Sequence, residues 1–430
     1  MLESIDGRDA AAPLHISRPQ ATPGEEPLEV VRSIIDQVRL EGDAALVELT
    51  SRYDGVRLEP EDLRVDPDVI AKARRLVRPE LIDALEVMHE RLRTTHEKQR
   101  PADSLGEAEA GLAGEVFRPL RRAGIYVPGG RAAYPSSVLM AAVPARVAGV
   151  ETLAVCSPPG RDGAVPEVVL AACSVAGIDE VYRVGGAQAI AALAFGTETV
   201  RPVDKIVGPG NIYVTLAKRA VQGSCGIDSE AGPTEICVIA DGSIRPEVIA
   251  ADLIAQAEHG PHGSHVLITW DPELAERVMG ALERQVALHE RPDDVENALI
   301  EGGTAVLVRD VDQAFEVANA FAPEHLSLMF DGAEEAMSRV RNAGAVFLGL
   351  FSPVSAGDYV AGTNHVLPTG GTARWASGLS TRDFMKSIYV SKLDRPALQR
   401  LAPSIDALAE AEGLHAHARA VWERLEGTEL

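Results

Sequence analysis

Gly124-Ile125-Tyr126-Val127 is the first of several short β-rich runs between residues 124 and 221. A helical pattern follows it, and the order of a short β-rich run, a glycine-containing turn and a helix repeats up to residue 221. We expect the later strands at 153–156, 180–184 and 205–207, and the helices at 138–147, 168–176, 189–195 and 212–221. Alternating strands and helices are typical of a parallel sheet, because each helix returns the chain to the edge where the next strand starts. The sequence therefore predicts a parallel α/β unit here.

A second series of the same kind follows. Its expected strands are 266–269, 305–308, 326–329 and 345–348, and its expected helices are 246–258, 272–288 and 311–320. Helical patterns also cover 27–100 and 395–426. The predicted fold class is α/β, with two incomplete Rossmann-like parallel-sheet domains and helical N-terminal and C-terminal extensions. The expected boundaries are an N-terminal arm over 1–25, a first α/β domain over 26–120 plus 236–375, a second over 121–235, and a C-terminal extension over 376–430.

The composition favours a cytoplasmic globular enzyme. The 430 residues are 46% hydrophobic and include 41 basic and 64 acidic side chains, which gives a net charge of −23. Such a charge repels nucleic acids and anionic membranes, and it suits a cationic or zwitterionic small substrate. The acidic N-terminal residues lack the pattern of an export signal, and the apolar runs are too short to span a bilayer. The four cysteines show no C-x-x-C spacing and are expected to be buried thiols.

The polar chemistry is concentrated beyond residue 250, where eight of the eleven histidines lie: His259, His262, His265, His289, His325, His365, His415 and His417. Gln256 and His259 are three residues apart near the end of an apolar helix, so they share a face and could bind one cation. A histidine at a helix C-terminus is also favoured by the helix dipole, which is the structural alternative. His262 and His265 continue an H-x-x-H-x-x-H spacing, but the glycines and the proline between them interrupt the helix that would align a metal site.

Two further segments carry candidate catalytic groups. Glu324 and His325 stand between a helix and a strand, and a carboxylate beside an imidazole suits general acid/base chemistry. A capping or solvated loop pair is the alternative there. The turn-rich segment around Asp358 and His365 predicts a long ordered loop, and such loops are usually functional.

Established catalytic motifs do not decide the reaction. The H-E-x-x-H, G-x-S-x-G and Walker patterns do not occur in the sequence, and G-x-G-x-x-G begins at Gly208 but lacks its last glycine. Glu412, His415 and His417 place a carboxylate and two imidazoles near the chain end, where exposed helix residues are the alternative. The residues therefore leave two classes open, a zinc hydrolase and a dehydrogenase.

Nine sequence strings together resemble the histidinol dehydrogenase family. They occur in the order of that family, and the joint match is highly specific: IYVPGG (125–130), VGGAQA (184–189), GPGNIYV (208–214), AGPTE (231–235), QAEH (256–259), PEHL (323–326), GDY (357–359), NHVLPTGG (364–371) and EGL (412–414).

The resemblance implies an activity and a catalytic site. Members of the family oxidise L-histidinol to L-histidine through L-histidinaldehyde, passing two hydrides to two NAD molecules in turn, and this is the last step of histidine biosynthesis. The resemblance implies that His325 takes the alcohol proton as the first hydride leaves, and that Glu324 activates the water that adds to the aldehyde. It also implies that one zinc ion is bound by Gln256, His259, Asp358 and His417.

The resemblance further implies substrate, cofactor and subunit contacts. The zinc would hold the imidazole and amine of the substrate, and Glu412 and His417 would come from the other subunit of a homodimer. The metal and catalytic residues would then lie mainly in the first α/β domain and the NAD site in the second. The implied NAD-site residues are Tyr126, Gln188 and Asn211, and the implied substrate-binding residues are Thr234, Gln256, His259, His325, Asp358, His365, Glu412 and His417.

Departures from the family pattern and alternatives from other classes stay open. Many relatives carry serine in place of Thr234, which keeps the hydroxyl, and an acidic residue in place of Gly260. Paralogues oxidise other hydroxylated small molecules with the same Glu-His pair, but Glu412 and His417 favour histidinol, because they would serve its amine and imidazole. A zinc hydrolase and a catalytically inactive relative are the other readings. We expect His262 and His265 to be loop histidines, and no role follows for them or for His415.

Overall fold

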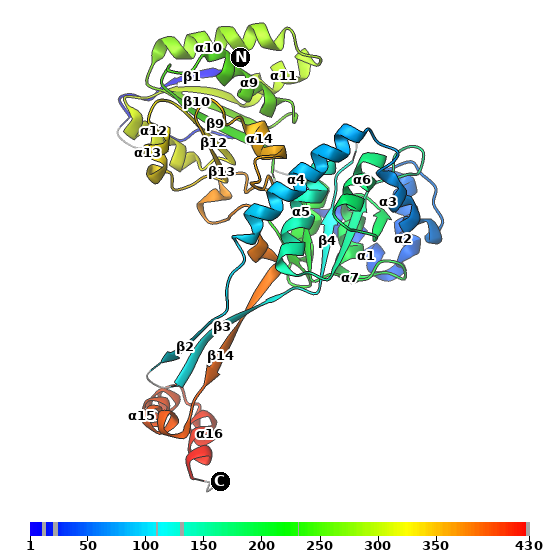
Figure 1. Ribbon diagram of the computed structural model, residues 1–430, viewed down its shortest axis with the longest axis vertical. Helices are drawn as coiled ribbons and strands as arrows, with labels where there is room; N and C mark the ends of the chain where they lie inside the picture. The colour runs from blue at the N-terminus through cyan, green and yellow to red at the C-terminus, as the bar shows by residue number, and fades with distance from the viewer. Residues whose placement is uncertain (11–13, 20–24, 109–110, 130–132, 231, 427–430) are drawn as a thin grey trace.

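The computed structural model describes residues 1–430 except 11–13, 20–24, 109–110, 130–132, 231 and 427–430. Two positions of the quoted strings, Gly130 and Ala231, lie outside the described residues. The chain forms two parallel sheets covered by helices and a projecting arm that ends in the C-terminal helices (Figure 1). The predicted α/β class with parallel sheets is confirmed. Within the described residues, no helix combines the length and the apolar character needed to cross a membrane.

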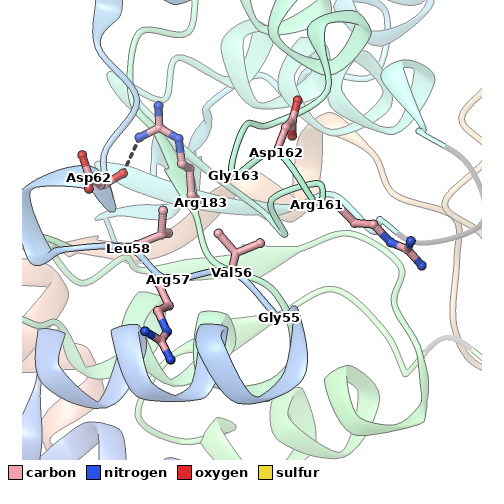
Figure 2. A pocket seen from close by; sticks show the side chains of 9 residues that line it. All are labelled: Gly55, Val56, Arg57, Leu58, Asp62, Arg161, Asp162, Gly163 and Arg183. Carbon is pink, nitrogen blue, oxygen red and sulfur yellow. Dashed lines mark hydrogen bonds between the residues drawn. The ribbon is translucent and has the colours of Figure 1, made fainter.

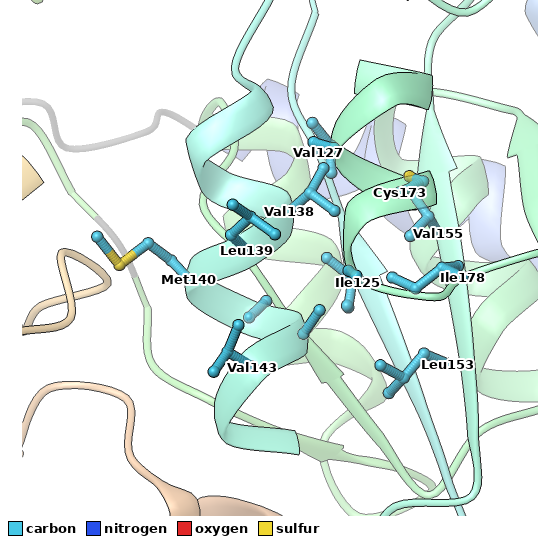
Figure 3. Close-up of a cluster of buried hydrophobic side chains, with 14 of the residues drawn as sticks. Ile125, Val127, Val138, Leu139, Met140, Val143, Leu153, Val155, Cys173 and Ile178 are labelled. Atoms are coloured by element: carbon cyan, nitrogen blue, oxygen red, sulfur yellow. The ribbon is translucent and has the colours of Figure 1, made fainter. Parts of the chain in front are cut away.

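A five-stranded parallel sheet occupies the centre of the larger unit, in the order β6-β5-β4-β7-β8. Its strands are β4 (Arg122–Tyr126), β5 (Thr152–Ser157), β6 (Val181–Arg183), β7 (Lys205–Val207) and β8 (Gly226–Ile227). The helices between them are α5 (Pro135–Ala148), α6 (Glu167–Val175), α7 (Gly186–Phe195) and α8 (Ile212–Val221). Ile125 and Val155 pack beneath α5 and α6 (Figure 3), whereas Tyr126 and Cys156 face α7, because successive strand residues point to opposite faces.

The N-terminal helices cover the same five-stranded sheet. They are α1 (Glu25–Glu41), α2 (Asp43–Tyr53), α3 (Pro67–Ala73) and α4 (Pro79–Glu97), with a short 3₁₀ turn η1 (Pro60–Asp62). Val31 and Val38 of α1 join the core beside α7, and Leu85 and Leu92 of α4 join the core beside α5. This packing differs from the expected grouping of 26–120 with 236–375. The apolar spacing of a helix predicts which of its faces is buried, but not which sheet that face covers.

The second sheet has six parallel strands in the order β1-β11-β10-β9-β12-β13. They are β1 (Glu3–Asp6), β9 (Glu235–Ala240), β10 (Ser264–Thr269), β11 (Gly303–Leu307), β12 (His325–Met329) and β13 (Ala345–Leu348). The edge strand β1 and the helix α14 were not expected from the sequence, which predicted a loop around Asp358. The helices of this unit are α9 (Pro246–Ala257), α10 (Pro272–Val286), α11 (Pro292–Gly302), α12 (Val311–Phe321), α13 (Ala333–Ala336) and α14 (Val354–Tyr359).

A three-stranded antiparallel sheet forms the arm, and the sequence did not predict it. Its order is β14-β3-β2, with β2 (Ser104–Ala108), β3 (Gly111–Pro119) and β14 (Met385–Lys392). The predicted C-terminal helices α15 (Arg395–Ala411) and α16 (His415–Glu426) lie at its far end (Figure 1). Short 3₁₀ turns complete the chain: η2 (Met337–Arg339), η3 (Thr372–Arg374) and η4 (Thr381–Phe384).

Candidate active site

The predicted catalytic pair, Glu324 and His325, lies at the amino end of β12, beside the amino end of the neighbouring strand β9 in the six-stranded sheet. Glu235 begins β9 and His325 begins β12, and His325 is paired with Ile236 in the parallel register. After β9 the chain adds β10 and β11 on one side of β9, and it then returns to add β12 on the other side. The strand order therefore reverses between β9 and β12. Ligands of open α/β sheets usually bind at the carboxyl ends of the strands. The catalytic pair lies at the opposite edge of this sheet.

The surroundings of His325 fix its tautomer. The side chain is buried, and Nδ1 lies 2.9 Å from the carbonyl oxygen of Glu235. A peptide carbonyl can only accept, so Nδ1 carries the hydrogen, and the amide nitrogen of Gln256 at 3.0 Å from Nδ1 adds no second hydrogen bond. Nε2 keeps its lone pair and lies 4.0 Å from Oδ1 of Asp358. Burial lowers the pKa of His325, so the neutral ring can accept a proton at Nε2.

Glu324 is a buried carboxyl group held beside this imidazole. Its Oε2 accepts hydrogen bonds from the Thr234 hydroxyl at 2.8 Å and from the Glu235 N–H at 2.9 Å, and it lies 3.4 Å from Nδ1 of His325. Burial raises the pKa of Glu324 to about 8, and the two hydrogen bonds oppose that rise without cancelling it. The carboxyl therefore keeps its proton near neutral pH, and the carboxylate formed on losing it is a strong general base.

Three of the four predicted metal ligands surround His325. Gln256 lies in the last turn of α9, His259 follows that helix, and Asp358 lies near the end of α14. Helix C-termini carry partial negative charge, which favours a cation at this place. Burial and repulsion from His325 lower the pKa of His259. Burial is also the main reason that the pKa of His365 falls to about 4, and His325 and His259 add to it, so these rings lie within electrostatic range of one another.

The donor set fits zinc in its chemistry. An imidazole nitrogen, a carboxylate oxygen and an amide oxygen are ligands that this borderline cation accepts. His365 fixes the helix end that carries Asp358, because its Nδ1 donates to the Asp358 carbonyl oxygen at 3.0 Å. Within one chain, the described residues contain no group of three or more His, Cys, Asp and Glu side chains placed to hold a metal ion. This chain supplies only two side chains of these types to the predicted metal site, His259 and Asp358, because the third predicted ligand, Gln256, is an amide.

The remaining predicted site residues are not near this cluster within the chain. Glu412 caps the end of α15 and His417 lies in the first turn of α16, and both are exposed. Figure 1 shows α15 and α16 at the far end of the arm, away from β9 and β12.

The predicted NAD-site residues gather at the carboxyl edge of the five-stranded sheet. Tyr126 ends β4, Gln188 lies in the first turn of α7, and Asn211 caps α8 through hydrogen bonds of 3.1 and 3.2 Å. The Tyr126 hydroxyl accepts from the Gly186 N–H at 3.1 Å, which ties β4 to the start of α7. The neighbours β4 and β7 form the point where the strand order reverses, and dinucleotides bind at such a point in related sheets.

Sequence reasoning missed a buried ion pair that holds the glycine loop before Asn211. Lys218 and Asp228 are paired, with side chains 2% and 4% exposed. Lys218 Nζ donates to the Gly208 carbonyl at 3.1 Å, and Asp228 Oδ2 accepts from the Gly208 N–H at 2.8 Å. Gly208 has a φ of 117°, and a Cβ there would collide with the Tyr126 carbonyl. A lysine in a helical pattern ordinarily indicates a solvent-facing position, so only its apolar neighbours signalled this burial.

The other histidines have separate surroundings. His262 is exposed, and its Nδ1 pairs with Glu301 at 2.6 Å. His265 is fully buried in β10, and in the described structure neither of its ring nitrogens has a hydrogen-bond partner. His415 is exposed at the start of α16. The H-x-x-H-x-x-H spacing therefore places His262 and His265 in different environments.

A cavity of about 430 Å³ lies away from these residues, between the segment after α2 and the ends of β5 and β6 (Figure 2). It is lined by none of the predicted site residues. Arg57, Arg161 and Arg183 contribute to its walls, but Figure 2 shows their guanidinium groups pointing apart, and Arg183 is bonded to the Asp62 carbonyl. The cationic groups therefore do not converge on one ligand position.

Comparisons with known proteins give the same family over most of the chain. The sequence model of a family described as histidinol dehydrogenase matches residues 18–425. Histidinol dehydrogenase from Methanothermobacter thermautotrophicus is 48% identical over 402 residues, covering 93% of this chain and 94% of that protein. The enzyme of the same name from Moorella thermoacetica is 50% identical over 398 residues, covering 92% and 94%. The crystal structure of histidinol dehydrogenase from Elizabethkingia anophelis superposes with a TM-score of 0.92 at 36% identity, covering 99% of this chain and 98% of that one. The chain therefore belongs to the histidinol dehydrogenase family.

Proposed function

We propose that this chain oxidises L-histidinol to L-histidine through L-histidinaldehyde with two molecules of NAD, as the last step of histidine biosynthesis. The observation that carries the proposal, beside family membership, is the buried pair Glu324 and His325. The imidazole has a free Nε2 because Glu235 holds Nδ1–H, and the carboxyl has a raised pKa because it is buried. These are the two proton acceptors that the two oxidations need.

In the first oxidation, His325 acts as the general base. Its Nε2 takes the hydroxyl proton of histidinol while the carbon-bound hydrogen leaves with its electron pair for the nicotinamide. The products are the aldehyde, NADH and one proton. The Glu235 carbonyl keeps the ring oriented during this step, because the hydrogen bond at Nδ1 strengthens when the ring becomes positively charged.

In the second oxidation, Glu324 activates water. Its carboxylate takes a proton as the water oxygen adds to the aldehyde carbon, and the aldehyde oxygen takes the proton that His325 Nε2 gained in the first oxidation, which gives a gem-diol and returns His325 to its neutral form. The gem-diol then loses a hydride to the second NAD and a proton to His325, so the products are the carboxylate of histidine, NADH and protons. The hydroxyl of Thr234, 2.8 Å from Glu324 Oε2, orients the carboxylate for this step.

We further propose that Gln256, His259 and Asp358, with His417 from a partner subunit, bind zinc. When bound, zinc supplies a Lewis-acidic cation that holds the imidazole and amine of the substrate. Thr234 and His365 would contact the substrate from this chain, and Glu412 of the second copy would neutralise its ammonium group. The exposed side chains of Tyr389 and Leu408 on the arm support assembly as a homodimer, because they are apolar surface that a second subunit would cover. We place the enzyme in the cytoplasm, where its four free, buried cysteines would stay reduced.

The NAD site proposed at Tyr126, Gln188 and Asn211 makes a testable prediction about the Lys218–Asp228 pair. Lys218→Met is expected to weaken NAD binding about tenfold, because the lost hydrogen bond and the unpaired Asp228 loosen the backbone of Gly208. Isothermal titration of NAD into the protein measures this without turnover. Asp228→Asn, which keeps the shape of the side chain, provides a second variant, and Lys72→Met, at an exposed lysine of α3, is the control. Unchanged affinity in both Gly208-linked variants would contradict the assignment.

The function itself is tested by one assay. Zinc-loaded protein incubated with L-histidinol and NAD is expected to form two NADH for each histidine, followed by absorbance and by amino-acid analysis. A signal only with another hydroxylated compound would favour a paralogous dehydrogenase. No NADH from any alcohol, together with hydrolysis of an amide or ester by the metal-loaded protein, would favour a zinc hydrolase.

A further inference from the structure

Arg18 lies in the N-terminal segment, residues 1–25, and contacts the start of β9 through Glu235, which is 217 positions away in the sequence. Its Nε donates to Glu235 Oε1 at 2.6 Å and its Nη2 donates to Oε2 at 3.2 Å, so the guanidinium group binds the carboxylate in a bidentate manner. Nη2 also donates to the carbonyl of Phe321, and the guanidinium carbon lies 3.9 Å from the centre of the Phe321 ring. Arg18 therefore joins β9 to the end of α12.

Glu235 contacts both catalytic residues. Its N–H donates to Oε2 of Glu324 at 2.9 Å and its carbonyl accepts from Nδ1 of His325 at 2.9 Å. Its side chain accepts from the N–H of Glu324 at 3.3 Å and from the N–H of Gly370 at 3.0 Å. The position of Glu235 thus sets the orientation of Glu324 and the tautomer of His325.

Arg18 also holds the turn that delivers the pair. After Phe321, Ala322 adopts a left-handed conformation with φ 51°, and Glu324 and His325 follow within three residues. A non-glycine residue in this conformation persists only when its surroundings hold it there. The contacts of Arg18 with the Phe321 carbonyl and ring hold the residue that precedes the turn.

A purely structural role explains these contacts less well. The N-terminal arm is already attached through β1, which pairs with β11 over four residues, from Glu3 to Asp6. The partners of Arg18, by contrast, all adjoin the catalytic residues. The Glu235 side chain is only 4% exposed. Without Arg18 its carboxylate would be buried beside Glu324 with no positive partner, and the Glu235 side chain would change its position.

We propose that the Arg18–Glu235 ion pair is a positioning device for catalysis: it holds Glu324 and His325 in their reactive orientation, and aldehyde oxidation depends on it most. This inference rests on the proposed function of the catalytic pair. A lysine can replace the arginine only in part, because its ammonium group lacks the planar fork and the stacking face that bind Glu235 and Phe321 together.

The test compares Arg18→Ala, Arg18→Lys and the control Arg8→Ala, an arginine of the same arm whose partner Asp6 is exposed. Arg18→Ala is expected to lower kcat for aldehyde oxidation about 100-fold with little change in KM, because an ångström of misplacement costs about that much. Alcohol oxidation should fall less. Arg18→Lys should recover only part of the rate, and Arg8→Ala should match the wild type.

Chemical rescue separates positioning from a general loss of stability. Millimolar guanidinium chloride, compared with sodium chloride, is expected to restore about tenfold of the rate lost in Arg18→Ala by occupying the vacated place beside Glu235. A variant with a lowered melting temperature but wild-type kcat would overturn the proposal, as would a lost rate that guanidinium does not restore. If Arg18→Ala does not fold, the comparison of kcat with KM in Arg18→Lys decides in the same way.

A crystal structure of the folded Arg18 variant keeps this proposal distinct from the proposed function. If the wild-type protein has no activity on histidinol, the proposed function is refuted. The crystal structure of the Arg18 variant would then test on its own whether the ion pair positions Glu324. Positioning predicts that Glu324 Oε2 and the Glu235 N–H, now 2.9 Å apart, separate beyond hydrogen-bond distance. An unchanged geometry would overturn it.

Discussion

Glu324→Gln is expected to slow aldehyde oxidation by about 10²–10⁴-fold, the range that a general base contributes. Alcohol oxidation is expected to suffer much less, because His325 and not Glu324 accepts the alcohol proton. Glutamine keeps the shape of the side chain, and its amide oxygen can still accept from the Thr234 hydroxyl and the Glu235 N–H. Each half-reaction is measured separately, with histidinol and with histidinaldehyde as the starting compound. An equal loss in both would contradict the assignment of water activation to Glu324.

The pH dependence gives the same assignment an independent check. Because burial raises the pKa of Glu324 to about 8, the active carboxylate becomes more abundant as the pH rises through that value. The kcat/KM profile for the aldehyde, which reports the free enzyme, should therefore rise on the alkaline side of neutrality in the wild type. A bound divalent cation moves this limb to lower pH. Glu324→Gln should remove the limb.

Thermal melting tests whether unfolding contributes to the loss of aldehyde oxidation in Glu324→Gln. The pKa of Glu324 is higher in the folded chain than its ordinary value of 4.5, so the folded state binds this proton more tightly than the unfolded state. The contribution of this proton to the free energy of unfolding is complete at low pH, and it declines as the pH rises from about 4.5 through about 8. Glu324→Gln carries no such ionisation. It is expected to melt at a higher temperature than the wild type at alkaline pH.

His417→Ala is expected to lower zinc retention by more than about 100-fold, since even a residue that only supports a ligand commonly contributes 10–100-fold. Histidinol oxidation should fall with the metal content. Zinc is measured after dialysis against a weak chelator. The control is His415→Ala, two residues earlier in the same helix and equally exposed, which should keep its zinc. Full metal content in His417→Ala would remove His417 from the ligand set.

Mixing Glu324→Gln with His417→Ala, with aldehyde oxidation as the readout, tests whether His417 acts in the second subunit. In a dimer of one Glu324→Gln chain and one His417→Ala chain, shared sites would give one doubly altered site and one site with no substitution. Random reassociation should then restore about one quarter of the wild-type sites. Sites built within one chain would restore nothing, because each site would keep one of the two substitutions. Figure 1 shows α16 at the far end of the arm and β12 in the six-stranded sheet, so we expect the shared arrangement.

The three-stranded arm, which the sequence did not predict, shows where sequence periodicity stops being informative. The strands β2 and β3 contain glycine and acidic residues, and β14 has exposed side chains on both faces, so none has the apolar run that marks a buried strand. The third strand, β14, pairs with β3 through residues about 270 positions apart in the sequence, such as Tyr389 with Glu115. The helices α15 and α16 were predicted correctly, because helical spacing is a local signal.

The charged residues that support the site were missed for a related reason. Arg18, Glu235, Lys218 and Asp228 look like ordinary surface residues in the sequence, since charged side chains are seldom buried. Arg18 and Glu235 pair across 217 positions, and Lys218 and Asp228 are buried because the fold closes around their pair, so a local pattern indicates neither arrangement. His265 illustrates the converse, because we expected it in a loop and the fold places it, fully buried, inside β10.

The sequence alone determined the α/β class, most of the parallel strands and their helices, and through its motifs the family to which the chain belongs. These properties depend on apolar spacing and on short strings, both of which are local. Only the tertiary structure decided which sheet the N-terminal helices cover, that Glu324 and His325 lie at the amino edge of their sheet, and that Arg18 reaches them. Those properties depend on burial and on contacts between distant segments, which exist only after the chain has folded.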